Sequence, residues 1–383
     1  MRLVFDSSPF RYDPATGRGP SGVAKWSLGA LSELAKQNPK SELIGISPGL
    51  KPPTLPAASI GANVAYKTIP VPSRIHRVME LMRLQPPVER WVGGIDAVIG
   101  NAYIPPRTNK APSVPIFYDM SVLTHPGMHP KQRVVYIGSQ LRRVARSANV
   151  IVTISQSVRR EIVEYFNVPP GRVYVAYPAW QPVAFPGNSA VGKAEDFQKT
   201  LPSEYLLFVG TIEPRKNIAG LVTVMANLKA SRRDLPPLVL VGGQGWGEER
   251  FGEKLSELIA SGVVIRVGYL PDNCMESVYR GALGLVYASL YEGFGMPIIE
   301  AMAYGCPVIT SDLPSMKEVA GDAALLVDPN DHSQVEAAIV KIMDSEQSRS
   351  DLAAKGLVRA GDFSWDKTAA SLQEAVEHAI EGN

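Results

Sequence analysis

The sequence has little cysteine and no apolar run long enough to span a membrane. Its 383 residues include two cysteines, Cys274 and Cys306, which are too few for a disulfide framework and lack the paired spacing of a zinc site. We therefore expect a reducing compartment and a cytoplasmic location. Asp6 interrupts the apolar start MRLVF, so we expect no secretory signal. The longest uncharged stretch, residues 173–192, contains three prolines, which indicates a strand followed by a linker.

The sequence also lacks a strong net charge, but its charges are unevenly placed. Residues 1–180 carry a balance of +12 and residues 181–383 a balance of −10, which leaves +2 in total. We find no nucleic-acid-binding motif, so no nucleic-acid partner is expected. The basic half instead predicts a phosphorylated substrate or an anionic membrane surface as its partner.

One segment of the basic half has the composition of a membrane-surface helix. In residues 73–92, arginines alternate with apolar residues such as Ile75 and Val78. This pattern indicates a basic amphipathic helix on an anionic membrane, and equally an ordinary helix that packs on the core. The first interpretation predicts peripheral attachment to the inner face of the cytoplasmic membrane. For a second basic segment, residues 141–150, the ordinary interpretation is favoured.

Short β-rich runs alternate with helix-like segments along both halves of the chain. Continuous apolar strands separated by helices predict parallel sheets that are buried on both faces. The predicted fold class is therefore α/β, with two doubly wound Rossmann-like domains, residues 1–185 and 200–364, that face a cleft. The predicted strands are residues 2–5, 42–47, 97–100, 114–117, 149–155, 173–176, 205–210, 237–243, 263–268, 283–289, 307–310 and 324–327, and the predicted helices include 22–36, 131–147 and 156–166.

The loop after the predicted strand 205–210 carries two adjacent cations. Its sequence GTIEPRKN places Arg215 and Lys216 just before Asn217, which we expect to cap the following helix. Two cations at a helix start oppose the helix dipole, so an anionic ligand would offset that cost. A guanidinium and an ammonium together suit a diphosphate, and the alternative is a solvated charge pair in a surface loop.

A second loop places two carboxylates around a glycine-containing turn. In YEGFGMPIIEAMAYG, residues 291–305, Glu292 precedes the turn and a helix is expected to start at Pro297. The helix N-terminus favours a phosphate, and Glu300 in the first helical turn points back toward it. Two hydrogen-bond acceptors beside a phosphate cradle predict a nucleotide-sugar site. The alternative is that Glu300 only offsets the helix dipole while Glu292 is solvated.

These glutamates belong to a longer motif. The E-x7-E arrangement of EGFGMPIIE, with its flanks YASLY and AMAYGCPVITSD, resembles retaining glycosyltransferases of family 4, which have the GT-B fold. The resemblance continues in GTIEPRKN, LVLVGGQGWGE, GYLPD (268–272) and FSWDKTAASL, so it covers nearly all of the second domain. It is looser in the first domain, where it rests on residues 19–23 and on IFYDMSVLTHP (116–126). We also expect the C-terminal helix, residues 365–383, to join the first domain.

The resemblance implies a role for each matching residue. Arg215 and Lys216 would bind the donor diphosphate, Glu300 the donor ribose, and Glu292 the transferred sugar. Gly22 would let the backbone of the first domain approach the diphosphate. The other implied donor-binding positions are Gly210, then Gly268, Tyr269 and Leu270 near the base, and the backbone of Phe294, Gly295 and Met296.

The first domain departs from the family pattern at one position. Family members often have a His-Asp pair after a central strand, and here the pair reads Tyr118-Asp119. Asp119 remains a candidate for contact with the sugar or the acceptor. His125 is a candidate source of the missing imidazole, against the alternative that it is a bystander. We find no D-x-D pattern of metal-dependent transferases, so neither a metal nor another cofactor is expected.

Together these features predict a hexosyltransferase that uses a nucleotide-sugar donor, with GDP-mannose favoured. The acceptor would be a hydroxyl of a glycan or of a polyprenyl-linked oligosaccharide. Stabilising the leaving diphosphate is the main electrostatic task of such a reaction. Retention of configuration follows from the resemblance alone. The alternatives are a UDP-sugar-dependent transferase, an epimerase or phosphorylase of the same fold, and a non-catalytic nucleotide-sugar-binding protein.

Overall fold

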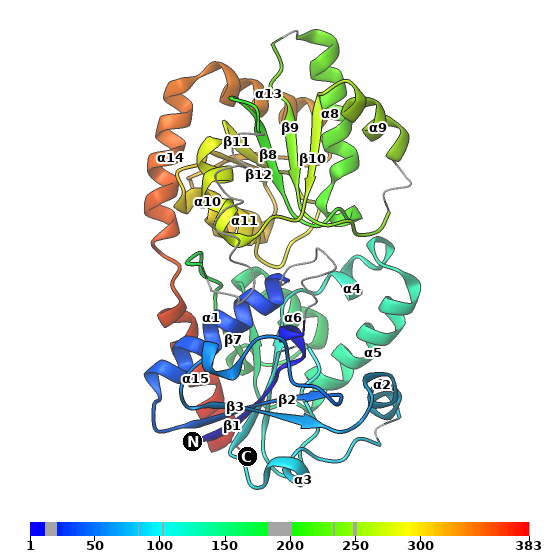
Figure 1. Ribbon diagram of the computed structural model, residues 1–383, viewed down its shortest axis with the longest axis vertical. Coiled ribbons are helices and arrows are strands. Elements are labelled where there is room, and N and C mark those ends of the chain that lie inside the picture. The colour runs from blue at the N-terminus through cyan, green and yellow to red at the C-terminus, as the bar shows by residue number, and fades with distance from the viewer. Residues whose placement is uncertain are drawn as a thin grey trace.

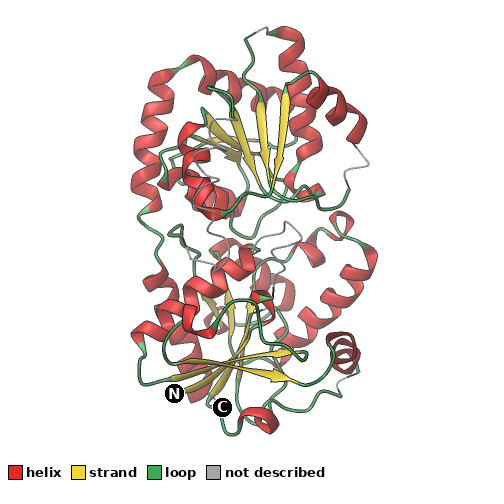
Figure 2. Cartoon of the chain, viewed as in Figure 1, coloured by secondary structure: helices red, strands yellow, loops and turns green. Residues whose placement is uncertain are grey.

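The computed structural model describes residues 1–11, 21–82, 84–101, 103–182, 201–232, 234–247 and 251–382. Within these residues the chain forms two parallel sheets, each covered by helices and stacked one above the other along the long axis (Figures 1 and 2). The predicted α/β architecture of two doubly wound Rossmann-like units is therefore confirmed.

The first sheet has the strand order β3-β2-β1-β4-β5-β6-β7, and its order reverses between β1 and β4. Loops that follow the strands on either side of such a reversal diverge and leave room for ligands. The strands are β1 Arg2–Asp6, β2 Glu42–Pro48, β3 Val64–Ile69, β4 Ala97–Gly100, β5 Ser113–Phe117, β6 Ile151–Thr153 and β7 Val173–Val175. The helices of this half are α1 Gly22–Gln37, α2 Ser73–Leu81, α3 Glu89–Val92, α4 Ser121–Thr124, α5 Lys131–Ser147 and α6 Gln156–Phe166, with short 3-10 turns η1 Ser8–Phe10, η3 Ala57–Ser59, η4 Pro126–Met128 and η5 Pro170–Arg172.

The second sheet has the order β10-β9-β8-β11-β12-β13 and reverses between β8 and β11. The loops after β8 and β11 carry the two predicted site motifs, so the reversal brings them together. The strands are β8 Leu206–Val209, β9 Leu238–Val241, β10 Val264–Gly268, β11 Gly284–Tyr287, β12 Val308–Ser311 and β13 Leu325–Val327. The helices are η6 Pro214–Lys216, α8 Ile218–Ser231, α9 Gly252–Ala260, α10 Asp272–Gly281, α11 Met296–Ala303, α12 Pro314–Ala320, α13 His332–Asp344, α14 Glu346–Ala360 and α15 Trp365–Glu381.

The last helix, α15, returns to the first sheet (Figure 1). Its Trp365 packs so closely on α1 that a Cβ at Gly29 would lie 2.4 Å from the indole ring. Gln373 accepts a hydrogen bond from Asn38 Nδ2 at 2.9 Å, just beyond the C-terminus of α1. The chain therefore crosses between the two halves twice among these elements, once after β7 and once between α14 and α15.

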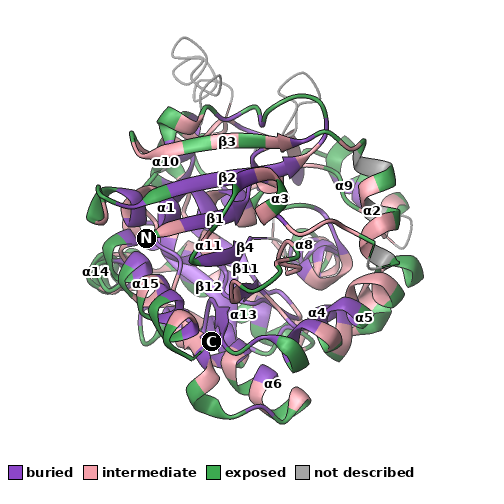
Figure 3. Cartoon of the chain, turned by 90° about the horizontal axis from the view of Figure 1, so that it is seen from below, coloured by how far each residue is buried: buried purple, intermediate pink, exposed green. Residues whose placement is uncertain are grey.

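Some sequence expectations differ from the structure. Strand β3 was not expected because its residues alternate between exposed and half-buried at the edge of the sheet, whereas β1 and β2 are almost wholly buried (Figure 3). The single helix expected over residues 73–92 is two helices, α2 and α3. Residues 141–150 are the end of α5, where Leu141 and Val144 are buried, and the turn that follows it. Helix α11 starts at Met296, one residue before the expected position.

Candidate active site

Loops from the two halves meet where β5 and β11 end. The backbone at Gly293 lies so close to the carbonyl oxygen of Tyr118 that an added Cβ would be 1.9 Å from it. Ser155 Oγ donates a hydrogen bond to the carbonyl oxygen of Gly293 at 2.7 Å, and the amide of Met120 donates to the hydroxyl of Tyr291 at 3.0 Å. The facing strand ends of the two sheets are therefore in direct contact.

Arg215, Lys216 and Glu292 form one ion cluster on the second sheet. Glu292 Oε2 lies 2.5 Å from Arg215 Nη1, and Glu292 Oε1 lies 2.5 Å from Lys216 Nζ. Glu213 pairs with Arg215 Nε at 2.5 Å, and the hydroxyl of Tyr287 donates to Glu292 Oε1 at 2.9 Å. Two cations and two carboxylates are thus paired in one group in which only Arg215 is partly exposed, so the solvated alternatives for the loop cations and for Glu292 do not describe it.

The charges in this cluster act strongly on one another. Burial by itself would raise the pKa of Glu292, but Arg215 and Lys216 outweigh it and lower the pKa to about 2. Burial lowers the pKa of Lys216 against the opposing attraction of Glu292. Glu292 is therefore a carboxylate throughout the physiological pH range, and it fixes the position of both cations.

The backbone that presents the two cations is a 3-10 turn and not the start of a helix. Lys216 ends η6, and Asn217 follows in the left-handed region with a φ of 57°. Asn217 precedes α8 as expected, but its side chain does not cap that helix. Its Nδ2 donates to the carbonyl oxygens of Ala288 and Pro329 at 3.1 and 2.8 Å. The amide of Leu290 also donates to the carbonyl oxygen of Arg215 at 2.8 Å, which joins the β8 and β11 loops.

Glu300 lies apart from this cluster, beside the first helix of the other half. Tyr279 donates a hydrogen bond to Glu300 Oε2 at 2.8 Å, and Lys25 Nζ of α1 lies 3.8 Å from Glu300 Oε1 and 2.7 Å from Asp272. A cavity of about 30 Å³ remains next to this group, lined in part by Trp180. Glu300 is the fifth residue of α11, so it lies just beyond the first turn in which we expected it.

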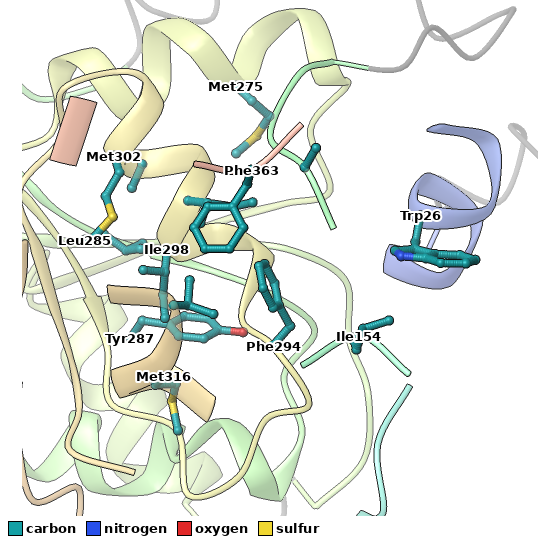
Figure 4. Close-up of a cluster of buried hydrophobic side chains, with 14 of the residues drawn as sticks. Trp26, Ile154, Met275, Leu285, Tyr287, Phe294, Ile298, Met302, Met316 and Phe363 are labelled. Atoms are coloured by element: carbon teal, nitrogen blue, oxygen red, sulfur yellow. The ribbon is translucent and has the colours of Figure 1, made fainter. Parts of the chain in front are cut away.

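The other expected donor-binding residues lie around the N-termini of α1 and α11. A Cβ at Gly22 would be in ordinary contact with Met296 Sδ at 3.9 Å, so the starts of the two helices face each other across the domain boundary. Gly295 has a φ of 99°, which lets the chain turn into α11. The side chain of Phe294 is buried and packs edge-on against Phe363, with ring centroids 5.4 Å apart (Figure 4), so only its backbone is placed to meet a ligand. Gly210, Gly268, Tyr269 and Leu270 lie at the ends of β8 and β10.

The first-domain candidates lie on the opposite side of the contact. Asp119 Oδ1 accepts hydrogen bonds from the amide and the hydroxyl of Ser121, at 3.0 and 2.6 Å. The ring of His125 packs on Tyr291 with centroids 4.8 Å apart, and its Nδ1 is 2.9 Å from the hydroxyl of Thr124. His125 is therefore held against the second domain.

The sequence interpretation missed His129. Its Nε2 lies 2.9 Å from Ser121 Oγ, which connects this imidazole to Asp119 through one hydroxyl. The only signal in the sequence was the repeated His-Pro of HPGMHP, in which the second histidine lies four positions after His125.

The described part of the chain holds neither a metal-binding cluster nor a membrane-spanning helix. There, no three His, Cys, Asp or Glu side chains gather closely enough to hold a metal ion. No helix in the same part is both long and apolar enough to cross a bilayer. Residues 19 and 20 of the first-domain motif lie outside the described residues.

Comparisons with known proteins agree with this geometry. Residues 20–180 match the family described as Glycosyltransferase Family 4, and residues 193–358 match Glycosyl transferases group 1. The O-antigen chain mannosyltransferase B of Escherichia coli is 37% identical over 268 residues, which cover 70% of each chain. The O-antigen chain mannosyltransferase RfbU of Salmonella typhimurium is 27% identical, over 73% of this chain and 77% of its own.

Solved structures share the whole fold at low identity. Sucrose-phosphate synthase from Thermosynechococcus elongatus matches over 100% of both chains with a TM-score of 0.71 and 19% identity. The Anabaena protein HepE, in complex with UDP and glucose, matches 99% of this chain and 100% of its own with a TM-score of 0.65 and 16% identity. At these identities the likeness establishes the fold alone.

The two facing sheets, the ion cluster at their strand ends and the family matches together define a glycosyltransferase of the GT-B fold. The chain belongs to the family 4 glycosyltransferases, in the group that includes the O-antigen mannosyltransferases. The resemblance stated from the E-x7-E motif is confirmed.

Proposed function

We propose that this protein transfers mannose, with retention of configuration, from GDP-mannose to a hydroxyl of a glycan or lipid-linked oligosaccharide. The observation that carries the proposal is the ion cluster of Arg215, Lys216 and Glu292 beside the N-terminus of α11, in which Lys216 and Glu292 are buried and Arg215 is partly exposed. A non-catalytic binding protein has no need of two such cations held by one buried carboxylate. The mannosyltransferase relatives favour mannose as the sugar.

In this mechanism the bond between the anomeric carbon and the diphosphate oxygen breaks, and the acceptor oxygen bonds to the same face of that carbon. The acceptor hydroxyl gives its proton to a donor phosphate oxygen. Arg215 and Lys216 then stabilise the charge that grows on the leaving diphosphate, together with the backbone N–H groups of Gly295 and Met296. No metal or other cofactor takes part in this proposal.

Glu292 and Glu300 have different tasks in this mechanism. Because Glu292 already touches both cations, we assign it to holding them in place as well as to contact with the transferred sugar. Glu300 binds the donor ribose, and its neighbour Lys25 closes that site from the first domain. The contact of Lys25 with Glu300 makes ribose binding sensitive to how the two domains meet.

An exposed apolar surface on α2 and α5 supports the proposal of a lipid-linked acceptor. Helix α2 exposes Ile75 and Val78 at 54% and 53%, Met82 just after it is 64% exposed, and Val135 on the adjoining α5 is 73% exposed. Basic residues of the same half surround these apolar side chains in sequence. Such a combination binds anionic bilayer surfaces, so we propose that the protein is peripheral on the inner face of the cytoplasmic membrane.

The test is thermal stabilisation by GDP, UDP and ADP, measured side by side, followed by hydrolysis of the matching sugar donors. We expect the largest shift in melting temperature from GDP, and release of α-mannose from GDP-mannose by NMR. A preference for UDP would overturn the donor but keep the mechanism. No response to any nucleotide would overturn the proposed function.

The same assay separates binding from chemistry through Arg215. We expect Arg215→Ala to lower donor turnover about 100-fold or more, the usual cost of losing one preorganised charge-stabilising group. The matched control is Arg232→Ala, which removes an arginine that pairs with Asp344 away from the site. Near wild-type turnover in a folded Arg215→Ala protein would remove this side chain from the mechanism.

A further inference from the structure

A cavity of about 340 Å³ opens at the domain boundary next to the ion cluster. Its walls are the turn 127–130 of the first domain, and Pro214, Trp246 and Gly247 of the second. Pro214 directly precedes Arg215, so the cavity borders the place where the diphosphate would leave. Its volume is within the range of about 300–1,000 Å³ of small-molecule sites. None of the expected donor contacts uses it.

Trp246 is held firmly in the wall of this cavity. Its Nε1 donates a hydrogen bond to the carbonyl oxygen of Met128 at 3.0 Å, and the guanidinium of Arg133 lies 6.0 Å from the ring centroid. The polar atom of the indole is therefore satisfied by the first domain. What the ring offers to a ligand is its flat apolar surface, which suits the C–H face of a pyranose ring.

His129 supplies a polar group to the same cavity, and its tautomer follows from its partners. Asp119 Oδ1 accepts a hydrogen bond from the amide of Ser121 and a second one, at 2.6 Å, from the Ser121 hydroxyl. The hydrogen of that hydroxyl therefore points at Asp119. With its hydrogen so used, Ser121 Oγ can only accept from His129 Nε2 at 2.9 Å. Nδ1 of His129 then carries no hydrogen, and its lone pair is free to accept a hydrogen bond.

That lone pair has no hydrogen-bond partner among the residues that the structure describes, although the atom is shielded from solvent. A buried acceptor without a partner costs about 1–3 kcal/mol, which calls for an explanation. Burial lowers the pKa of His129, which favours the neutral ring and keeps Nδ1 an acceptor. His129 is one of the residues that line the cavity, so a ligand bound there is the nearest source of the missing partner.

We propose that this cavity is the subsite for the acceptor sugar: one pyranose ring packs on the indole of Trp246, and one of its hydroxyls donates a hydrogen bond to Nδ1 of His129. The inference rests on the proposed transfer reaction and adds the place of the second substrate. His129 orients the hydroxyl, and the proton still leaves to a donor phosphate oxygen. Asp119 acts through Ser121 and His129 as a positioning residue.

Two substitutions of His129 separate this role from a structural one. His129→Gln places an amide nitrogen near the position of Nε2, so it keeps the donor to Ser121 but has no acceptor near Nδ1. His129→Asn places an amide oxygen near Nδ1 and gives up the contact with Ser121. A structural role predicts that glutamine is the better replacement, whereas the acceptor role predicts asparagine.

The experiment measures transfer from GDP-mannose to octyl glycosides of mannose, glucose, galactose and N-acetylglucosamine, and continues with the fastest. We expect His129→Gln and Trp246→Ala to raise the acceptor KM at least fivefold, while His129→Asn and Trp246→Phe retain more of the affinity. The shift in melting temperature with GDP is measured for each variant as the internal control, because it reports whether the donor half is intact without using the acceptor.

The outcomes are distinguishable. If the wild-type protein hydrolyses GDP-mannose but no glycoside accelerates turnover, or if the acceptor KM is unchanged in His129→Gln and Trp246→Ala, the cavity is not the acceptor subsite. A greater loss in His129→Asn than in His129→Gln would assign His129 to structure and also overturn the inference. Failure of the wild-type protein to bind GDP or hydrolyse any sugar donor would instead refute the proposed function, and this inference with it.

Discussion

Asp6 shows how a single residue at a strand end can reduce stability. It ends β1, where the first sheet faces the second, and it is 8% exposed. Burial raises the pKa of Asp6 to about 6, although the amide of Ser8 donates to its Oδ1 at 2.9 Å. The folded state therefore disfavours the ionised form of Asp6, which lowers the free energy of unfolding at neutral pH.

We expect Asp6→Asn to stabilise the protein in a pH-dependent way. The pKa of Asp6 is higher in the folded than in the unfolded state, so the free energy of unfolding of the wild type falls as pH rises from about 4 to 6. Asparagine does not ionise, so the variant does not show this fall. The advantage should reach about 3 kcal/mol at pH 8 and shrink toward pH 4. Melting temperatures at both pH values measure it, with Asp351→Asn on the exposed face of α14 as control. An equal shift at the two pH values would contradict the explanation.

At the scale of the element, helix α2 is unusual because two of its apolar side chains, Ile75 and Val78, are exposed. It is fastened to α5 by the hydroxyl of Tyr136, which donates to Glu80 Oε2 at 2.6 Å. Ile75 and Val78 are each more than half exposed, so these two side chains are not packed in the core. The membrane interpretation of residues 73–92 stays a prediction.

We expect the double substitution Ile75→Glu and Val78→Glu to weaken binding to phosphatidylglycerol vesicles at least tenfold, because it removes apolar contact and adds two repelled charges. Vesicle sedimentation measures the binding. The matched control is Leu357→Glu with Val358→Glu, which changes two exposed apolar residues on α14 of the other half. Donor hydrolysis in solution should not change. Equal vesicle binding by the two double variants would exclude α2 as the membrane surface.

Strands that are buried on both faces could be predicted from the sequence, because such burial requires a continuous run of apolar residues. Strand β3 could not, since its edge position gives it the pattern of a surface segment. The motifs also predicted that Arg215 and Glu292 serve one ligand. Their direct pairing could not be predicted, because it joins loops 77 residues apart through the sheet order. The place of His129 likewise could not be predicted, because it depends on the contact of its Nε2 with Ser121 in the folded chain.

On the scale of the whole molecule, the second half supplies the cap of a helix in the first. Glu318 of α12 accepts from the amides of Gln156 and Ser157, at 2.7 and 2.8 Å, at the start of α6. The same carboxylate accepts from the hydroxyl of Tyr177 at 2.7 Å. A negative charge at a helix N-terminus is favourable, so this one side chain stabilises the contact between the two halves.

We expect Glu318→Gln to shift the molecule toward more open arrangements by about tenfold or more, because hydrogen bonds to a charged group contribute about 1.5–3 kcal/mol. Small-angle X-ray scattering should show a larger radius of gyration, which GDP-mannose reverses. Glu336→Gln is the control, since Glu336 accepts a hydrogen bond from Asn227 within its own half. An unchanged radius of gyration would show that Glu318 does not control closure.

The contact between Gly293 and the carbonyl oxygen of Tyr118 bears on the construction of hybrid enzymes. If the first half selects the acceptor, as we propose, exchanging it for that of a relative is a route to new glycosidic linkages that leaves the E-x7-E motif intact. The two surfaces, however, meet without room for a single methyl group at this point. The two halves of a hybrid will therefore fit only when the imported first half follows the same backbone path after β5. A hybrid that keeps the present second half, with Gly293, should also keep the present loop at 118–120 of the first half.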